Sequence, residues 1–260
     1  MEILEAIVLG IIQGLTEFLP VSSSGHLEIG KSLFDIDPES SFSFSVAVHG
    51  ATVLSTVVVF WQELLRLIKG SLEFRMNDET KYVLKIIVSM IPVAIFGLFF
   101  EENIEAFFDG NMVFVGAMLL VTAALLILSG LMKNRNREIT FLDAFVIGIA
   151  QALAVLPGIS RSGATISTGL MLGNKKEKLA GFSFLMVLVP VIGANLLELF
   201  KGDFSSSSSV GSTAIIAGFI SAFITGYLAC RWMVNLVSRG KIYWFGIYCT
   251  VIGLLLLILG

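Results

Sequence analysis

The chain has 260 residues, of which 56% are hydrophobic even without glycine, and only 14% are charged. Soluble domains have roughly 45–50% apolar residues with glycine counted, and about 25% charged residues. This composition excludes a soluble enzyme, a secreted disulfide scaffold and a disordered regulator, and the net charge of −3 excludes a strongly basic nucleic-acid binder. We therefore expect an all-α polytopic membrane protein that forms one integral membrane domain over residues 1–260.

The apolar segments follow one another in two similar series. Each series begins with a short segment, near 3–19 and near 143–156, that runs into a proline and then a Ser/Gly-rich stretch. This pattern predicts a broken, re-entrant helix pair rather than a full span. Three segments of about 20 residues, long enough to cross a bilayer, follow each pair. In chain order, these six predicted spans are 43–65, 82–101, 112–132, 181–200, 214–235 and 242–259.

The two short segments resemble each other at a shift of 138 positions. The polar matches at this shift are Gln13 with Gln151, Ser22 with Ser160, Ser24 with Ser162, and Gly25 with Gly163. We interpret them as the marks of two repeats, at approximately 1–132 and 139–260. Broken helices at corresponding positions of two halves point to a central site in the membrane.

The basic residues give an independent indication of topology. If both broken pairs are re-entrant, the loops near 67–81, 133–142, 175–180 and 236–241 share one side and hold 11 of the 17 basic residues. The positive-inside rule makes that side cytoplasmic, so both termini face outside. The first broken pair then enters from outside and the second from the cytoplasm. The halves are therefore inverted, and their tips meet near the midplane.

The first break has the sequence QGLTEFLPVSSSGH at residues 13–26. Gln13 and Glu17 are four residues apart and share a helix face. The serines after the proline are expected to cap the next helix, and His26 falls in its first turn. Because a carboxylate or histidine inside a membrane is costly, it indicates a functional site by default. The alternative is ordinary polarity at the membrane interface.

The second break has the sequence PGISRSGAT at residues 157–165. Arg161 is the one basic residue that lies in neither a loop nor a loop flank, and its planar fork suits a phosphate or carboxylate. Ser160, Ser162 and Thr165 add hydroxyl groups, and the glycines allow close approach of the backbone. The alternative is that Arg161 only forms a structural ion pair with Glu17.

Together the two breaks predict an anion site, most naturally for phosphate or diphosphate, at two helix N-termini. The residues expected to bind the phosphate groups are Ser22, Ser24, Gly25, Ser160, Ser162, Gly163 and Thr165. His49 lies in a predicted span and is expected to be a packing residue. Gly10 and Gly14 are four apart, which indicates close helix packing.

The segments QGLTEFLPVSSSGH and PGISRSGAT resemble the two signatures of the undecaprenyl-diphosphate phosphatases of the BacA/UppP type, and the resemblance extends over the whole chain. It implies a multi-pass enzyme of the bacterial cytoplasmic (inner) membrane that removes the terminal phosphate of undecaprenyl diphosphate. The product, undecaprenyl phosphate, carries cell-wall precursors in peptidoglycan biosynthesis. The family is associated with bacitracin resistance.

The resemblance also implies roles for particular residues. It places the catalytic functions on Glu17, Ser23, His26 and Arg161, and implies dependence on a divalent cation, Mg²⁺ or Ca²⁺. The family motif has an acid or an amide four residues before the glutamate, and this chain has Gln13 there. With one carboxylate, a metal ion would be held by Glu17, the Gln13 carbonyl, water and the substrate phosphates.

Several alternatives remain open at this point. Ser23 is the first candidate for the nucleophile, with His26 or Glu17 accepting its proton, but attack by His26 or by water also fits the spacing. The expected partners are a polyprenyl diphosphate lipid, which must enter through a lateral opening, and membrane lipids, with no nucleic acid. Monomer and homodimer are both compatible with the sequence. The main alternative function is a transporter or flippase of polyprenyl phosphate or another anion, and a purely structural scaffold is a third.

Overall fold

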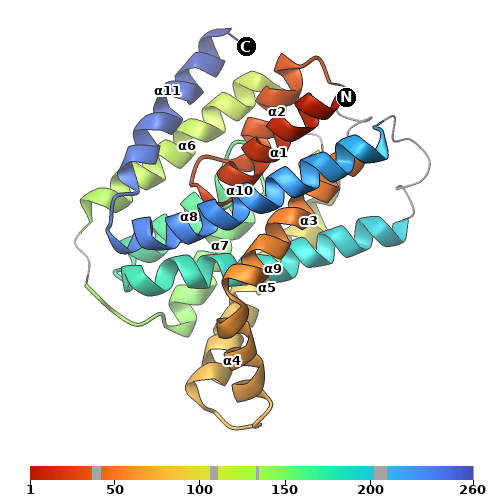
Figure 1. The fold of residues 1–260 in the computed structure, drawn as a ribbon. Helices are drawn as coiled ribbons and strands as arrows, with labels where there is room; N and C mark the ends of the chain where they lie inside the picture. Colours follow the sequence, from red (N-terminus) through yellow and green to blue (C-terminus); the bar gives the residue numbers. More distant parts are fainter. Residues whose placement is uncertain (37–41, 106–110, 133–134, 202–209, 260) are drawn as a thin grey trace.

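The computed structural model describes residues 1–36, 42–105, 111–132, 135–201 and 210–259. In these ranges it contains eleven α-helices and no β-strand, which confirms the all-α prediction (Figure 1). Residues 133–134 of the predicted loop 133–142 lie outside the described residues. The helices are α1 (Ile3–Phe18), α2 (Ser23–Leu33), α3 (Phe42–Val59), α4 (Trp61–Ser71), α5 (Asp78–Glu105), α6 (Met112–Leu131), α7 (Phe141–Leu153), α8 (Arg161–Met171), α9 (Lys176–Lys201), α10 (Ser212–Ser238) and α11 (Tyr243–Leu259).

Both helix breaks lie where the sequence predicts them. α1 ends just before Leu19, which is extended because a residue that precedes a proline disfavours the helical conformation. α2 then begins after Ser22, whose side chain accepts a hydrogen bond from the Gly25 N–H (3.3 Å). In the second break Ser160 caps α8 in the same way, and its side chain accepts from the Gly163 N–H (3.1 Å). These caps satisfy backbone donors that would otherwise be unpaired at the helix starts.

The described residues contain three helices long and apolar enough to cross a membrane, at Asp78–Gly97, Met112–Leu131 and Ser212–Ser238. The predicted span 43–65 is wrong as a single helix, because α3 and α4 meet at a bend of 72° and count at most as one broken span. The predicted span 242–259 corresponds to α11, whose 17 residues are slightly short. The chain is thus a multi-pass membrane protein with three to four candidate spans in its described part.

Figure 1 shows both termini at one end of the molecule and α4 projecting from the other. The first helix of each broken pair packs against a long helix of the other half of the chain, α1 on α10 and α7 on α5. Glycines permit these contacts. A Cβ added at Gly10 or Gly14 would overlap α10, and one added at Gly148 would overlap the Ser89 carbonyl of α5. The prediction of close packing at Gly10 and Gly14 is therefore confirmed.

Candidate active site

Glu17 lies in the last turn of α1 and is the centre of a hydrogen-bonded group in the first break. The Gln13 side chain donates from Nε2 to Glu17 Oε2 (2.9 Å), as expected for residues one turn apart. The Ser23 hydroxyl, at the start of α2, donates to the same carboxylate oxygen (2.7 Å). The break thus folds the first turn of α2 back onto the end of α1, and it places a hydroxyl directly on a carboxylate.

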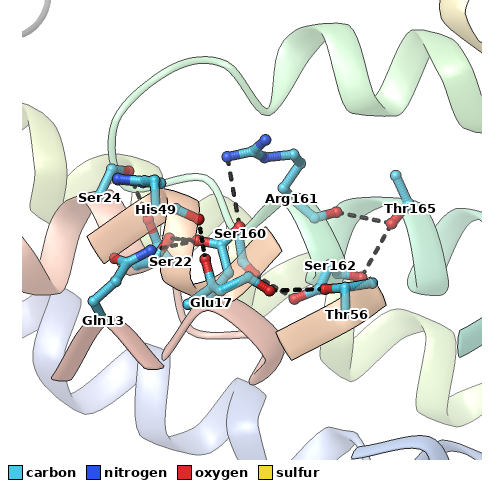
Figure 2. A network of polar contacts seen from close by, with 12 residues as sticks. Gln13, Glu17, Ser22, Ser24, His49, Thr56, Ser160, Arg161, Ser162 and Thr165 are labelled. Atoms are coloured by element: carbon cyan, nitrogen blue, oxygen red, sulfur yellow. Dashed lines mark hydrogen bonds and ion pairs between the residues drawn. The ribbon is translucent and has the colours of Figure 1, made fainter. Parts of the chain in front are cut away.

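Arg161 approaches this group from the second break. Its Nη2 lies 3.8 Å from Glu17 Oε1, so the two form an ion pair between residues 144 positions apart. The Arg161 side chain is 30% exposed and the Glu17 side chain 12% exposed, so the guanidinium is the more accessible partner of the pair. Figure 2 shows Arg161 extending over Glu17 beside Ser160. The ion pair that the sequence allows is therefore present.

The two breaks contact each other through their backbones as well. The Ser162 hydroxyl donates to the Leu19 carbonyl (3.3 Å). A Cβ added at Gly25 would lie 3.5 Å from the Gly158 Cα, and one added at Gly163 would lie 3.2 Å from the Pro20 Cβ. Each of these glycines therefore faces the opposite break.

The capping serines have the same arrangement in both halves. The Ser22 and Ser24 hydroxyls are 3.3 Å apart, and so are those of Ser160 and Ser162. In Figure 2 these side chains surround the Glu17 carboxylate and the base of Arg161. Of the residues predicted to bind phosphate, Ser162 lines the pocket beside Glu17 and Arg161, whereas Ser22 and Ser160 are buried.

His26 is not placed as the sequence suggested. Its Nε2 is hydrogen-bonded to the Tyr248 hydroxyl of α11 (2.8 Å), and its Nδ1 to the Ser22 carbonyl oxygen (2.8 Å). The imidazole also stacks on the Tyr248 ring, with the centroids 5.6 Å apart. Among the described contacts, none joins the imidazole to Ser23 or Glu17. No signal in the sequence marks a partner 222 positions away.

Thr165 is also held within the protein. Its hydroxyl donates to the Arg161 carbonyl (2.8 Å) and lies 2.6 Å from the Ser183 hydroxyl of α9. The residue is 1% exposed. Its hydroxyl therefore fixes the first turn of α8 against α9, one turn below the guanidinium.

α3 contributes polar residues that the sequence interpretation missed. Thr52 and Thr56 line a pocket together with Glu17 and Arg161, and His49 lies within electrostatic range of Glu17. Figure 2 shows His49 and Thr56 on either side of the carboxylate. Their spacing of three and then four residues along a predicted helix is a signal that could have found this face.

The lining of the pocket contains both polar and apolar residues. Its polar lining comes from α1, α3, α8 and α9 and consists of Glu17, Thr52, Thr56, Arg161, Ser162 and Ser183. Its apolar lining consists of Phe18, Val53, Phe184, Val187, Leu188 and Val191. This lining places the ion pair of Glu17 and Arg161 beside an apolar wall.

One observation bears on a metal ion. The Gln13 side chain is fully buried, and its Oε1 has no hydrogen-bond partner among the described residues, although its Nε2 is bonded to Glu17. An unpartnered carbonyl oxygen beside a carboxylate fits a cation that prefers oxygen ligands. No cluster of three or more His, Cys, Asp or Glu side chains is found in the part of the chain that the structure describes. Further ligands would have to come from water or substrate.

These features define a multi-pass helical membrane protein in which two broken helix pairs meet at a pocket lined by polar and apolar residues. The sequence model of the family "Bacitracin resistance protein BacA" matches residues 6–255, and the chain belongs to this family.

Three relatives are similar over almost their whole length, and each is named undecaprenyl-diphosphatase. The protein of Bacteroides fragilis is 51% identical over 262 residues, covering 99% of this chain and 98% of its own. That of Bacteroides thetaiotaomicron is 52% identical over 259 residues, covering 98% of each. The protein of Methanococcus vannielii is 44% identical over 258 residues, covering 96% of this chain and 98% of its own.

Proposed function

We propose that the chain is an undecaprenyl-diphosphate phosphatase, which hydrolyses the terminal phosphate of undecaprenyl diphosphate to give undecaprenyl phosphate and inorganic phosphate. The names of the relatives support this substrate. The observation that carries the chemistry is the contact of Ser23 and Arg161, from the two breaks, with the two oxygens of one carboxylate.

The hydrogen bond between Ser23 and Glu17 favours one of the open mechanisms. Ser23 Oγ attacks the terminal phosphorus while its proton passes to Glu17, and the bond from phosphorus to the bridging oxygen breaks. Undecaprenyl phosphate leaves with that oxygen. Water then attacks the phosphoserine, and Glu17 returns the proton to Ser23 as inorganic phosphate leaves. Arg161 and the helix N-termini stabilise the charge on the transferred group, which is the largest contribution expected for phosphoryl transfer.

The other residues have supporting roles in this proposal. His26, bonded to Tyr248, positions the first turn of α2 rather than accepting the Ser23 proton. Gln13 and Glu17 are the candidate ligands of a divalent cation, Mg²⁺ or Ca²⁺, which would neutralise phosphate charge when bound.

The nucleophile can be identified by trapping a phosphoenzyme with labelled substrate. A base-labile label that is absent from Ser23→Ala supports serine, an acid-labile label absent from His26→Ala supports histidine, and no label supports attack by water.

We also propose six spans in two inverted repeats, with both termini and the pocket facing outside. The contacts support a twofold relation, because α1 on α10 and α3 on α10 correspond to α7 on α5 and α9 on α5. A cysteine at position 24, in a background without Cys230 and Cys249, should react with an impermeant thiol reagent applied from outside. Labelling only from the cytoplasmic side would refute the orientation.

The activity is tested with purified protein in detergent. We expect phosphate release from undecaprenyl diphosphate that is lost in Glu17→Ala and Arg161→Ala. Arg231→Ala is the matched control, because Arg231 lies on α10 and bonds to Tyr227 within its own helix. A protein that releases no phosphate but moves polyprenyl phosphate between the leaflets of proteoliposomes would be a carrier instead.

A further inference from the structure

The pocket that contains Glu17 and Arg161 continues between α3 and α9 into apolar surroundings. Val53 of α3 faces Val187 and Val191 of α9 there, and α3 and α9 are in contact. Val187 and Val191 are one helical turn apart, so they lie on the same side of α9. We call the surface formed by Val53, Val187 and Val191 the seam. The seam is continuous with the polar lining of the pocket.

The seam ends at the outer surface of the helix bundle. Next to the pocket-lining valines along the chain, Ile192 of α9 is 39% exposed and Leu54 of α3 is 43% exposed. Large apolar side chains on the outside of a membrane protein face lipid tails. The apolar lining of the pocket is thus bordered by residues that contact the bilayer.

The opposite direction is closed by aromatic rings. Phe184 packs edge-on against Phe18, with the ring centroids 5.4 Å apart, and against Phe60, at 6.3 Å. Phe18 and Phe184 are buried, with 2% and 5% of their surfaces exposed. A chain held at Arg161 cannot pass through this layer, so the valines of α3 and α9 offer the apolar direction within the pocket lining.

We propose that the prenyl chain of the substrate leaves the phosphate site through the seam between α3 and α9, and that Val53, Val187 and Val191 determine the preference for a long prenyl chain. The inference rests on the proposed function and adds the route of the lipid. Isoprene units fit against valines because both are branched and apolar, and each buried methylene favours binding.

The test compares two valines on opposite sides of α9. Val191→Trp fills the seam, whereas Val189→Trp places the same bulk on the exposed side. We expect Val191→Trp to lower kcat/KM for undecaprenyl diphosphate about ten-fold or more, mainly through KM. Turnover of isopentenyl diphosphate, which has a single isoprene unit, should change by less than about two-fold. Val189→Trp should alter neither substrate.

A substitution to a smaller side chain controls for misfolding of Val191→Trp. Val191→Ala removes contact without adding bulk, and it should raise KM for the long substrate several-fold while leaving the short one unchanged. The proposed route would be overturned if both Val191 variants lost kcat/KM equally for the two substrates, or if the KM for the long substrate did not change. If the unaltered protein releases no phosphate from either substrate, both the proposed function and the proposed route of the prenyl chain are wrong.

Discussion

Replacing Gly148 with alanine adds one methyl group where α7 crosses α5. A Cβ at this position would overlap the Ser89 carbonyl oxygen and lie 2.8 Å from the carbonyl carbon and 2.9 Å from the Cα, whereas ordinary contacts begin at 3.4 Å. All three atoms belong to the backbone, so no rotation of a side chain can relieve the overlap. The two helices must therefore move apart.

The expected loss of stability follows from two opposing effects. Alanine is favoured over glycine inside a helix by about 1 kcal/mol. Overpacking of a close contact costs about 1–3 kcal/mol, and a contact with backbone belongs at the upper end of that range. The net destabilisation should therefore be about 1–2 kcal/mol. Activity should fall too, because α7 leads directly into the break that carries Arg161.

Thermal unfolding in detergent measures this effect. Gly50→Ala in α3 is the control, because a Cβ there meets nothing within 4 Å. With about 2–4 °C per kcal/mol for a chain of this size, Tm should fall by about 2–8 °C in Gly148→Ala. In Gly50→Ala it should stay the same or rise. If both variants unfold at the same temperature, the close contact between α7 and α5 does not limit stability as we argue.

Three further predictions concern separate parts of the molecule. Hydrogen bonds from two lysines lower the pKa of Glu138 to about 2 from its usual 4.5, so this carboxylate stabilises the fold above that usual value and loses its effect as the pH falls through about 2. Glu138→Gln should therefore lower the free energy of unfolding at pH 7 by less than about 1 kcal/mol, because the interaction is exposed. This difference should disappear below about pH 2, and a difference that does not change with pH would contradict the prediction. Thr122 makes two hydrogen bonds to the backbone of the second break. Thr122→Val should therefore lower the free energy of unfolding by about 1–3 kcal/mol. Thr250→Val, which loses a hydrogen bond within its own helix, should have little effect on Tm. Gln13→Glu adds a second carboxylate beside Glu17 and should lower the Mg²⁺ or Ca²⁺ concentration for half-maximal activity several-fold. If that concentration does not change, Gln13 and Glu17 are not the ligands of the cation.

Local sequence signals predicted the parts of the site that depend on neighbouring residues. The breaks, their capping serines and the pairing of Gln13 with Glu17 all involve partners within a few positions along the chain. The ion pair between Arg161 and Glu17 spans most of the chain, but the cost of an isolated charge in a membrane made a partner necessary.

Other features depend on three-dimensional packing that the sequence does not encode locally. The stretch around Phe60 is largely apolar and predicted one span, yet α3 and α4 bend there by 72°. His26 follows Ser23 at helical spacing, but its imidazole is held by Tyr248 of α11. Periodicity identifies the face of a helix, and it does not identify which distant helix covers that face.

The packing of α1 on α10 has a consequence for biosynthesis. α1 is made first, but Gly10 fits against Gly218, about 200 residues later in the chain. At roughly 5–20 residues per second, α1 waits about 10–40 s for its partner. For most of that interval the carboxylate of Glu17 lacks the guanidinium of Arg161, which lies 144 residues later in the chain. The first broken pair must therefore be completed late, and a nascent chain released before α10 would leave a polar helix end without its cover in the bilayer.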